Sequence, residues 1–212
     1  MNQKNLKNII SEIIFQKIPF CFFYEENKFS FEIPQNLLIL SGSFNPFHDG
    51  HKHMLLAAQK ETHYNPFLEI SITNVDKDPL VISDIQKKID MIISHNFPVI
   101  ISNAPRFLEK SNLFPGSIFL IGNDTFLRLF EIKYYNDFNS NTYSSTITKN
   151  LDIIKDNKCQ FLVAGRINEQ NIFTNIDLSL IPKKYERMFS SLDESKFRND
   201  ISSTKIRKFL QE

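Results

Sequence analysis

The segment from residue 37 to residue 58 places the strongest limit on how this chain can fold. It begins with the apolar run Leu37–Leu40, which predicts a short buried strand. A turn containing Gly42 and Pro46 follows, and apolar positions with helical spacing begin at Met54. A strand, a glycine-bearing turn and a helix start bring backbone N–H groups and the positive end of a helix dipole to one point. The segment therefore predicts an anion site at the end of the strand.

Two histidines lie three residues apart in this turn, at His48 and His51. At that spacing both rings can face one bound anion. Imidazole can donate a hydrogen bond, and next to a phosphate we expect it to be at least partly protonated. The alternative interpretations are a purely structural turn, or an adventitious metal cluster that includes His53.

The pattern G-x-F-x-P-x-H-x-G-H, which runs from Gly42 to His51, resembles the signature of the HIGH-type nucleotidyltransferases. Members of that superfamily join a nucleoside monophosphate to a phosphate-bearing acceptor. By this resemblance His51 binds the α-phosphate and is the main catalytic residue, while His48 assists at the phosphates. The resemblance also assigns Gly42, Ser43 and Phe44 to the nucleotide-binding loop.

A second anion site is predicted near the end of the chain, where Ser202 and Ser203 are good N-cap residues for a helix. Arg207 lies four residues after Ser203, so its side chain can lean back toward the start of that helix. The run from residue 201 to Arg207 resembles the second signature of the superfamily, in the form typical of nicotinamide or nicotinate mononucleotide adenylyltransferases. By that resemblance Ser203, Thr204 and Arg207 hold the β- and γ-phosphates, and Arg207 is also catalytic. Taken singly, Ser203 could be an ordinary cap and Arg207 a surface charge.

Four further assignments each have a structural alternative; that of Arg166 depends on its position at the end of the fifth predicted strand, and the others depend on the resemblance. Gly122 and Asp124 resemble the Gly-x-Asp that contacts the nucleoside ribose, although Asp124 could simply cap a helix. Arg166 could reach a phosphate or form a surface ion pair. Lys77 loosely matches a basic residue that helps to bind the acceptor phosphate, or it is an exposed loop lysine. Phe107 could stack on the acceptor's pyridine ring or belong to the core.

Strands and helices alternate after the signature. Apolar runs predict further strands at residues 67–73, 97–102, 117–122 and 160–164, with helices between them. Repeated βα units favour an α/β fold with a mainly parallel, doubly wound sheet. The resemblance implies a Rossmann-like sheet of about five strands in the order 3-2-1-4-5, with the ligand beyond the carboxyl ends of the strands. The polar stretch 137–148 predicts a loop.

Residues 1–35 precede this pattern. Leu6, Ile9, Ile10, Ile13 and Ile14 have helical spacing, and residues 20–24 and 28–33 read as a hairpin. We therefore expect a small N-terminal helix-hairpin appendage at 1–35 and a nucleotidyltransferase domain at 36–212.

Composition excludes several classes of protein. The formal net charge of +1 gives no reason to expect broad affinity for nucleic acid or membranes, and no apolar run near the N-terminus is long enough to span a bilayer. Cys21 and Cys159 do not form a CxxC pair, so they predict two buried free thiols in a reducing cytoplasm.

The resemblance implies a mononucleotide adenylyltransferase of NAD biosynthesis that binds ATP with Mg²⁺ and a phosphorylated small-molecule acceptor. No general base is required, because the attacking phosphate is already ionised, and no protein metal ligand is assigned. Other segments resemble a cytidylyltransferase-like branch. The alternatives are therefore a cytidylyltransferase, an adenylyltransferase for another phosphorylated acceptor, and a nucleotide-binding module without transferase activity. Relatives are often oligomeric, so a homo-oligomer is compatible with the resemblance, although no interface can be identified in the sequence.

Overall fold

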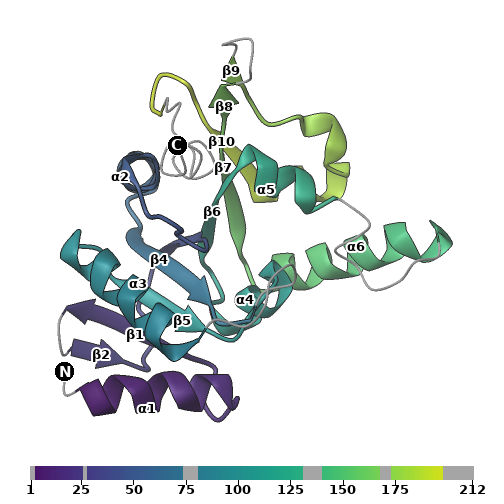
Figure 1. Ribbon diagram of the computed structural model, residues 1–212. Helices are drawn as coiled ribbons and strands as arrows, with labels where there is room; N and C mark the ends of the chain where they lie inside the picture. Colours follow the sequence, from purple (N-terminus) through teal and green to yellow (C-terminus); the bar gives the residue numbers. More distant parts are fainter. Residues whose placement is uncertain (1–2, 26–27, 74–80, 131–139, 168–172, 198–212) are drawn as a thin grey trace, which may run out of the picture.

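The computed structural model describes residues 3–25, 28–73, 81–130, 140–167 and 173–197 (Figure 1). The main sheet has eight strands in the order β10-β7-β6-β3-β4-β5-β1-β2. Their bounds are β1 (Phe20–Glu25), β2 (Lys28–Ser30), β3 (Leu37–Ser41), β4 (Asn65–Ser71), β5 (Val99–Ser102), β6 (Ile118–Gly122), β7 (Gln160–Ala164) and β10 (Phe189–Leu192). The five central strands run parallel in the order β5-β4-β3-β6-β7. This is the predicted order 3-2-1-4-5, and it confirms the Rossmann-like α/β fold.

Helices cover both faces of the sheet (Figure 1). They are α1 (Gln3–Ile14), α2 (Asp49–Thr62), α3 (Ile82–Ser94), α4 (Phe107–Leu113), α5 (Asn123–Arg128), α6 (Ser140–Asp156) and the 3₁₀ helices η2 (Leu178–Leu180) and η3 (Lys183–Met188). Leu38 and Leu40 of β3 point into the core beneath α1, α2 and α3, while Leu37 and Ile39 point into the core beneath α5 and α6. A strand buried on both faces reads as a continuous apolar run, which is why β3 was recognisable in the sequence.

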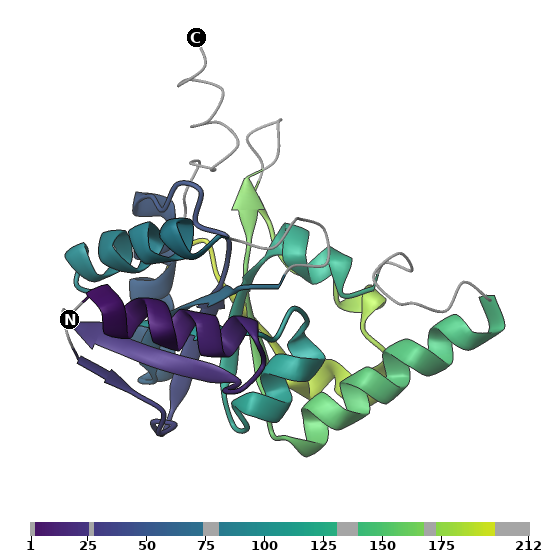
Figure 2. The same cartoon turned by 60° about the horizontal axis from the view of Figure 1, so that its bottom comes forward.

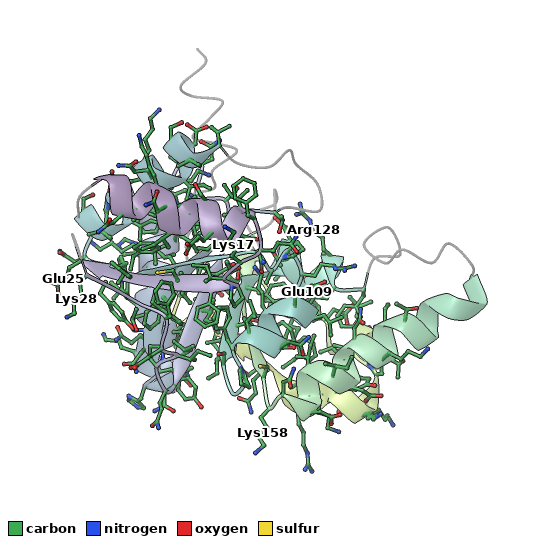
Figure 3. The ribbon with its side chains drawn as sticks, turned by 90° about the horizontal axis from the view of Figure 1, so that it is seen from below. Lys17, Glu25, Lys28, Glu109, Arg128 and Lys158 are labelled. Carbon is green, nitrogen blue, oxygen red and sulfur yellow. The ribbon has the colours of Figure 1, made fainter. Side chains whose placement is uncertain are left out.

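The N-terminal hairpin extends the main sheet, so the sheet has more strands than the five predicted. Strand β1 pairs antiparallel with β5, with Phe20 opposite Ser102, and β2 forms the edge. Helix α1 lies across this part of the sheet and packs against α3 (Figure 2). An ion pair of 3.9 Å between Lys28 and Glu25 joins the two strands at the edge (Figure 3). The domain boundary between residues 35 and 36 stays a prediction.

Three strands were absent from the sequence prediction. Strand β10 pairs in parallel with β7, and β8 (Arg166–Ile167) pairs with β9 (Phe173–Thr174) in a separate two-stranded sheet. Strand β10 has the sequence Phe-Ser-Ser-Leu, which contains too few apolar residues to be recognised. Its position comes from tertiary packing, because the Phe189 ring stacks on Phe161 of β7 with a centroid distance of 4.9 Å.

The loop predicted at 137–148 is wrong for most of its length, because α6 begins at Ser140. Serine, threonine and asparagine have modest helix propensity, so the composition indicated a loop. Burial of Ile147, Leu151 and Ile154 on the sheet accounts for the helix, since tertiary packing of an apolar face contributes more to helix stability than propensity does.

Both cysteines are free and buried, as predicted. Burial raises the pKa of Cys21 to about 12 and also raises the pKa of Cys159, so both thiols stay protonated at neutral pH. Within the described residues, no helix combines the length and the apolar character needed to cross a membrane.

Candidate active site

The loop after β3 is shaped by contacts within itself. The Gly42 N–H donates to the carbonyl oxygen of Glu69 at 3.0 Å, which continues the β3–β4 pairing by one residue. A Cβ atom at Gly42 would lie 2.9 Å from the ring of Phe44, and that ring is only 3% exposed. Phe44 has a positive φ of 43°. Glycine is therefore required at position 42 because the buried Phe44 ring folds back over it.

His48 and His51 lie together where α2 begins. His48 is the N-cap of α2, and its backbone N–H donates to Nδ1 of His51 at 3.4 Å. The two rings stack with a centroid distance of 3.8 Å, and Phe47 stacks on His51 with a centroid distance of 5.7 Å. Because Nδ1 of His51 accepts a hydrogen bond, the proton of the neutral ring lies on Nε2. His51 can thus donate a hydrogen bond from Nε2 at the positive end of the α2 dipole.

Both histidines favour the neutral form. Burial lowers the pKa of His51 to about 4, with a smaller contribution from His48, and burial also lowers the pKa of His48 despite the nearby Asp49. The partly protonated pair expected beside a phosphate is therefore not the state of the ligand-free protein at neutral pH. In that protein the hydrogen bonds to an anion would come from neutral imidazole.

Lys88 brings a positive charge to the same loop. Its side chain extends from α3, and Nζ donates to the carbonyl oxygen of Ser43. Nothing in the sequence singles out this lysine, because it stands beside Lys87 on a helix with an ordinary amphipathic pattern. Only the packing of α3 against the loop identifies it.

Gly122 and Asp124 lie across the sheet from these groups, at the end of the neighbouring strand. Strands β3 and β6 pair in parallel through Leu40 and Leu120, so both end at the same edge. Gly122 is the N-cap of α5, and Asp124 lies exposed in the first turn of that helix. Nothing within the described residues lies within 4 Å of where a Cβ atom of Gly122 would be. The structure therefore places Gly42, Ser43, His48 and His51 on one side of the switch point and Gly122 and Asp124 on the other.

The remaining predicted residues lie at the start of α4, after β7, or outside the described residues. Phe107 is half-buried, and its ring contacts Phe119 and Phe161 with centroid distances of 5.3 Å, so it borders the core at the start of α4. Arg166 is the first residue of β8 and is separated from the end of β7 by Gly165, but its side chain lies outside the described part of the structure. Lys77, Ser203, Thr204 and Arg207 lie outside the described residues.

The last described residues, Lys196 and Phe197, contact α2 and the core beneath it. Phe197 is 9% exposed and belongs to the same core as Phe44 and Phe47. Next to it, Lys196 forms an ion pair with Glu61 of α2 at 2.7 Å. The chain is thus held against the helix that carries His51 immediately before the segment that contains the second signature.

No group of three or more histidine, cysteine, aspartate or glutamate side chains that could hold a metal ion occurs within the described residues. The exposed His53 therefore forms no such cluster with His48 and His51 there.

Comparisons with known proteins agree with the fold. The family model for cytidylyltransferase-like proteins matches residues 39–209. No curated protein matches the chain. Among the solved structures that match is nicotinic acid mononucleotide adenylyltransferase from Plasmodium falciparum, in complex with NaAD. It is 17% identical, the match covers 84% of each chain, and the TM-score is 0.51. At that identity the likeness shows a shared fold.

Proposed function

The chain belongs to the cytidylyltransferase-like family, whose members are nucleotidyltransferases, and we propose that it transfers AMP from ATP to the phosphate of nicotinamide or nicotinate mononucleotide. The observation that carries this proposal is the stacked pair His48 and His51 at the start of α2, opposite Gly122 and Asp124 at the switch point of the sheet. Ligands of doubly wound folds bind at that point, beyond the carboxyl ends of the strands.

The reaction forms one P–O bond and breaks another. A phosphate oxygen of the acceptor attacks the α-phosphorus of ATP in line, and the bond from that phosphorus to the β-phosphate's bridging oxygen breaks. Its electron pair leaves with pyrophosphate. The attacking oxygen is already ionised near neutral pH, so the protein's task is to align the reactants and to stabilise the charge that moves onto the leaving group.

The described residues fit that task. His51 donates from Nε2 to an oxygen of the α-phosphate, and His48 assists at the phosphates. The start of α2 adds the positive end of its dipole. We add Lys88, whose ammonium group holds the Ser43 carbonyl within the same loop. By resemblance Ser203, Thr204 and Arg207 bind the β- and γ-phosphates, and Asp124 and Gly122 bind the ribose. Arg166 is assigned to a phosphate because of its position after the fifth central strand.

Magnesium enters this proposal as part of the nucleotide substrate. Mg²⁺ is usually held by substrate phosphates, water and few protein ligands. The wider proposal includes a cytoplasmic location and a role in NAD biosynthesis, with Lys77 and Phe107 on the acceptor side.

Two similarities support a pyridine nucleotide as the acceptor. The run from residue 201 to Arg207 has the form typical of mononucleotide adenylyltransferases. The Plasmodium falciparum relative was solved with NaAD bound, and it shares this chain's fold.

The test is pyrophosphate release by the purified protein with Mg-ATP or Mg-CTP, each offered nicotinamide mononucleotide or nicotinate mononucleotide. We expect release that requires ATP and one of the two pyridine nucleotides, with the corresponding dinucleotide formed in equal amount. Binding of ATP without release for either acceptor would overturn the proposal and favour the nucleotide-binding module.

A cytidylyltransferase is the second candidate, and the description of the family model is the observation that favours it. In the same assay it predicts pyrophosphate release from CTP, with a phosphorylated acceptor other than a pyridine nucleotide. Competition between the two nucleotides for binding separates the candidates: ATP should displace CTP if the first proposal is correct.

A further inference from the structure

A buried ion pair lies beneath the carboxyl edge of the sheet, beside the candidate active site. Lys110 Nζ of α4 is 2.7 Å from Glu69 Oε2 of β4, and the two side chains are 5% and 1% exposed. The other carboxylate oxygen of Glu69 accepts from Ser102 Oγ of β5 at 2.6 Å. Lys110 directly follows Glu109, which is labelled on α4 in Figure 3. The proposed reaction uses none of these three buried groups.

The same cluster holds the turn at residues 103–106. Lys110 Nζ donates to the carbonyl oxygen of Ala104 at 2.7 Å, and the Ala104 N–H donates to Ser102 Oγ at 3.2 Å. Both backbone polar groups of Ala104 are therefore bound by the cluster, and Ala104 is 1% exposed. A second bond fixes the turn from the end of β4, because Thr73 Oγ1 donates to the carbonyl oxygen of Asn103 at 3.1 Å.

Glu69 joins this turn to the phosphate-binding loop. Its carbonyl oxygen accepts from the Gly42 N–H at 3.0 Å, while its side chain binds Lys110 and Ser102. Strand β4 lies between β3 and β5, so the loop after β3 and the turn after β5 are two strand spacings apart, about 10 Å. Both follow carboxyl ends of parallel strands, where ligands of such sheets bind. The turn therefore borders the active site on the side away from Gly122.

Stability alone gives no reason for charges at this position. Removing a lysine and a glutamate from water costs several kcal/mol per ion, and well-packed apolar residues often replace such pairs with no loss of stability. A network with every member satisfied does, however, specify one geometry closely. The geometry specified here is the distance between the Gly42 loop and the 103–106 turn.

We propose that Glu69, Ser102 and Lys110 are positioning residues that hold the 103–106 turn as the acceptor-side wall of the active site. This rests on the proposed function, which places ATP between β3 and β6 and leaves the ends of β4 and β5 to the acceptor. The residues act through the turn and do not touch either substrate.

The test uses the double variant Glu69→Gln/Lys110→Met in the full-length protein. It removes both charges and the bond to Ala104, while the amide oxygen can still accept from Ser102. The single variant Lys110→Met leaves a buried carboxylate without its cation, so we expect it to unfold at a lower temperature than the double variant. In the double variant we expect the KM of the acceptor to rise about tenfold, and the KM of ATP to change less than twofold.

Hydrogen exchange at the 103–106 turn gives a readout that does not need catalysis. In the double variant we expect faster exchange at this turn and unchanged exchange in β3 and β6. Hydrogen exchange shows whether the cluster holds the turn even if the pyridine nucleotides are not the acceptors. The positioning role and the proposed function can therefore fail separately. Unchanged exchange at the turn would overturn the proposal.

Tyr185→Phe is the matched control, because it removes the hydroxyl of a buried residue in η3, a helix that packs against α6 and β10. The Tyr185 hydroxyl donates to Asp152 Oδ1 at 2.9 Å and fastens η3 to α6. We expect it to lower the unfolding temperature without changing the ratio of the two KM values. If the double variant changes both KM values in the same proportion as this control, the cluster is only structural and the proposal is wrong.

Discussion

His51 is bound on three sides by groups of its own loop and helix. Its ring lies between Phe47 and His48, and the edge of Phe44 meets it with a centroid distance of 5.2 Å. Replacement of His51 by alanine would cost stability as well as activity, because removing a half-buried ring from this stack would leave a cavity. Asparagine is the better replacement, since it fills part of the space and keeps a hydrogen-bond acceptor for the His48 N–H.

We expect His51→Asn to reduce turnover by roughly 10²- to 10³-fold, because one hydrogen bond to the charge developing at the α-phosphate is lost. The measurement is kcat for pyrophosphate release at saturating substrates. The control is His53→Asn, which changes an exposed histidine two residues further along the same helix. An active His51→Asn enzyme, with kcat like that of the control, would contradict the assigned role.

At the scale of elements, the Lys88 side chain connects α3 to the loop after β3. Lys88 extends from the helix that follows β4 to the loop that follows β3. It bonds to Ser43, which is 45 positions earlier in the chain. Charge-assisted hydrogen bonds are stronger than neutral ones. The conformation of the loop thus depends on how α3 packs, as well as on Gly42 and Phe44 within the loop itself.

Lys88→Met should raise the KM of ATP roughly tenfold, because a hydrogen bond from a charged group contributes about 1.5–3 kcal/mol. The matched control is Lys87→Met on the same helix, whose side chain is 80% exposed and 3.7 Å from Asp84. Such exposed ion pairs contribute little, so we expect no change in that variant. Steady-state kinetics with ATP as the varied substrate provide the measurement. Equal KM values for ATP in the two variants would show that the contact between Lys88 and the loop does not contribute to ATP binding.

At the scale of the whole molecule, the buried histidines link folding to pH. The pKa of His51 falls from 6.5 to about 4 on burial, and that of His48 also falls. The unfolded chain therefore binds more protons than the folded protein between these pH values. The contribution of these neutral histidines to the free energy of unfolding is fully present above about pH 6.5, and it is lost as the pH decreases toward about 4.

The contribution of His51 to this loss should be on the order of 2–3 kcal/mol, given 1.36 kcal/mol per pKa unit and the partial exposure of the ring. We expect the free energy of unfolding to decrease more in the wild-type protein than in His51→Asn when the pH changes from 7.5 to 4.5. Urea denaturation at both pH values measures the difference. The same decrease in both proteins would mean that His51 is not buried as the neutral form.

Sequence patterns predicted those segments of the protein whose structure depends on residues adjacent in the chain. The apolar run of β3, the glycine and proline of the following turn and the start of α2 are adjacent in the chain, so the sequence alone predicted a strand, a loop and a helix start in the right places. The anion site at this loop stays a prediction. The parallel order of the central strands also followed from the alternation of strands and helices, together with the resemblance. The predicted roles at Lys77, Ser203, Thr204 and Arg207 stay predictions, since those residues are outside the described part of the chain.

Tertiary structure alone decided the features that depend on residues far apart in sequence. Lys88 reaches Ser43, Glu69 reaches Lys110, and Phe189 stacks on Phe161, and none of these pairs has a pattern that a single sequence can reveal. The pairing of β1 with β5 likewise depends on which sheet edge is open after the chain has folded. The physical reason is that periodicity records which side of an element is buried, whereas the partner that buries it is chosen by packing across the whole sheet.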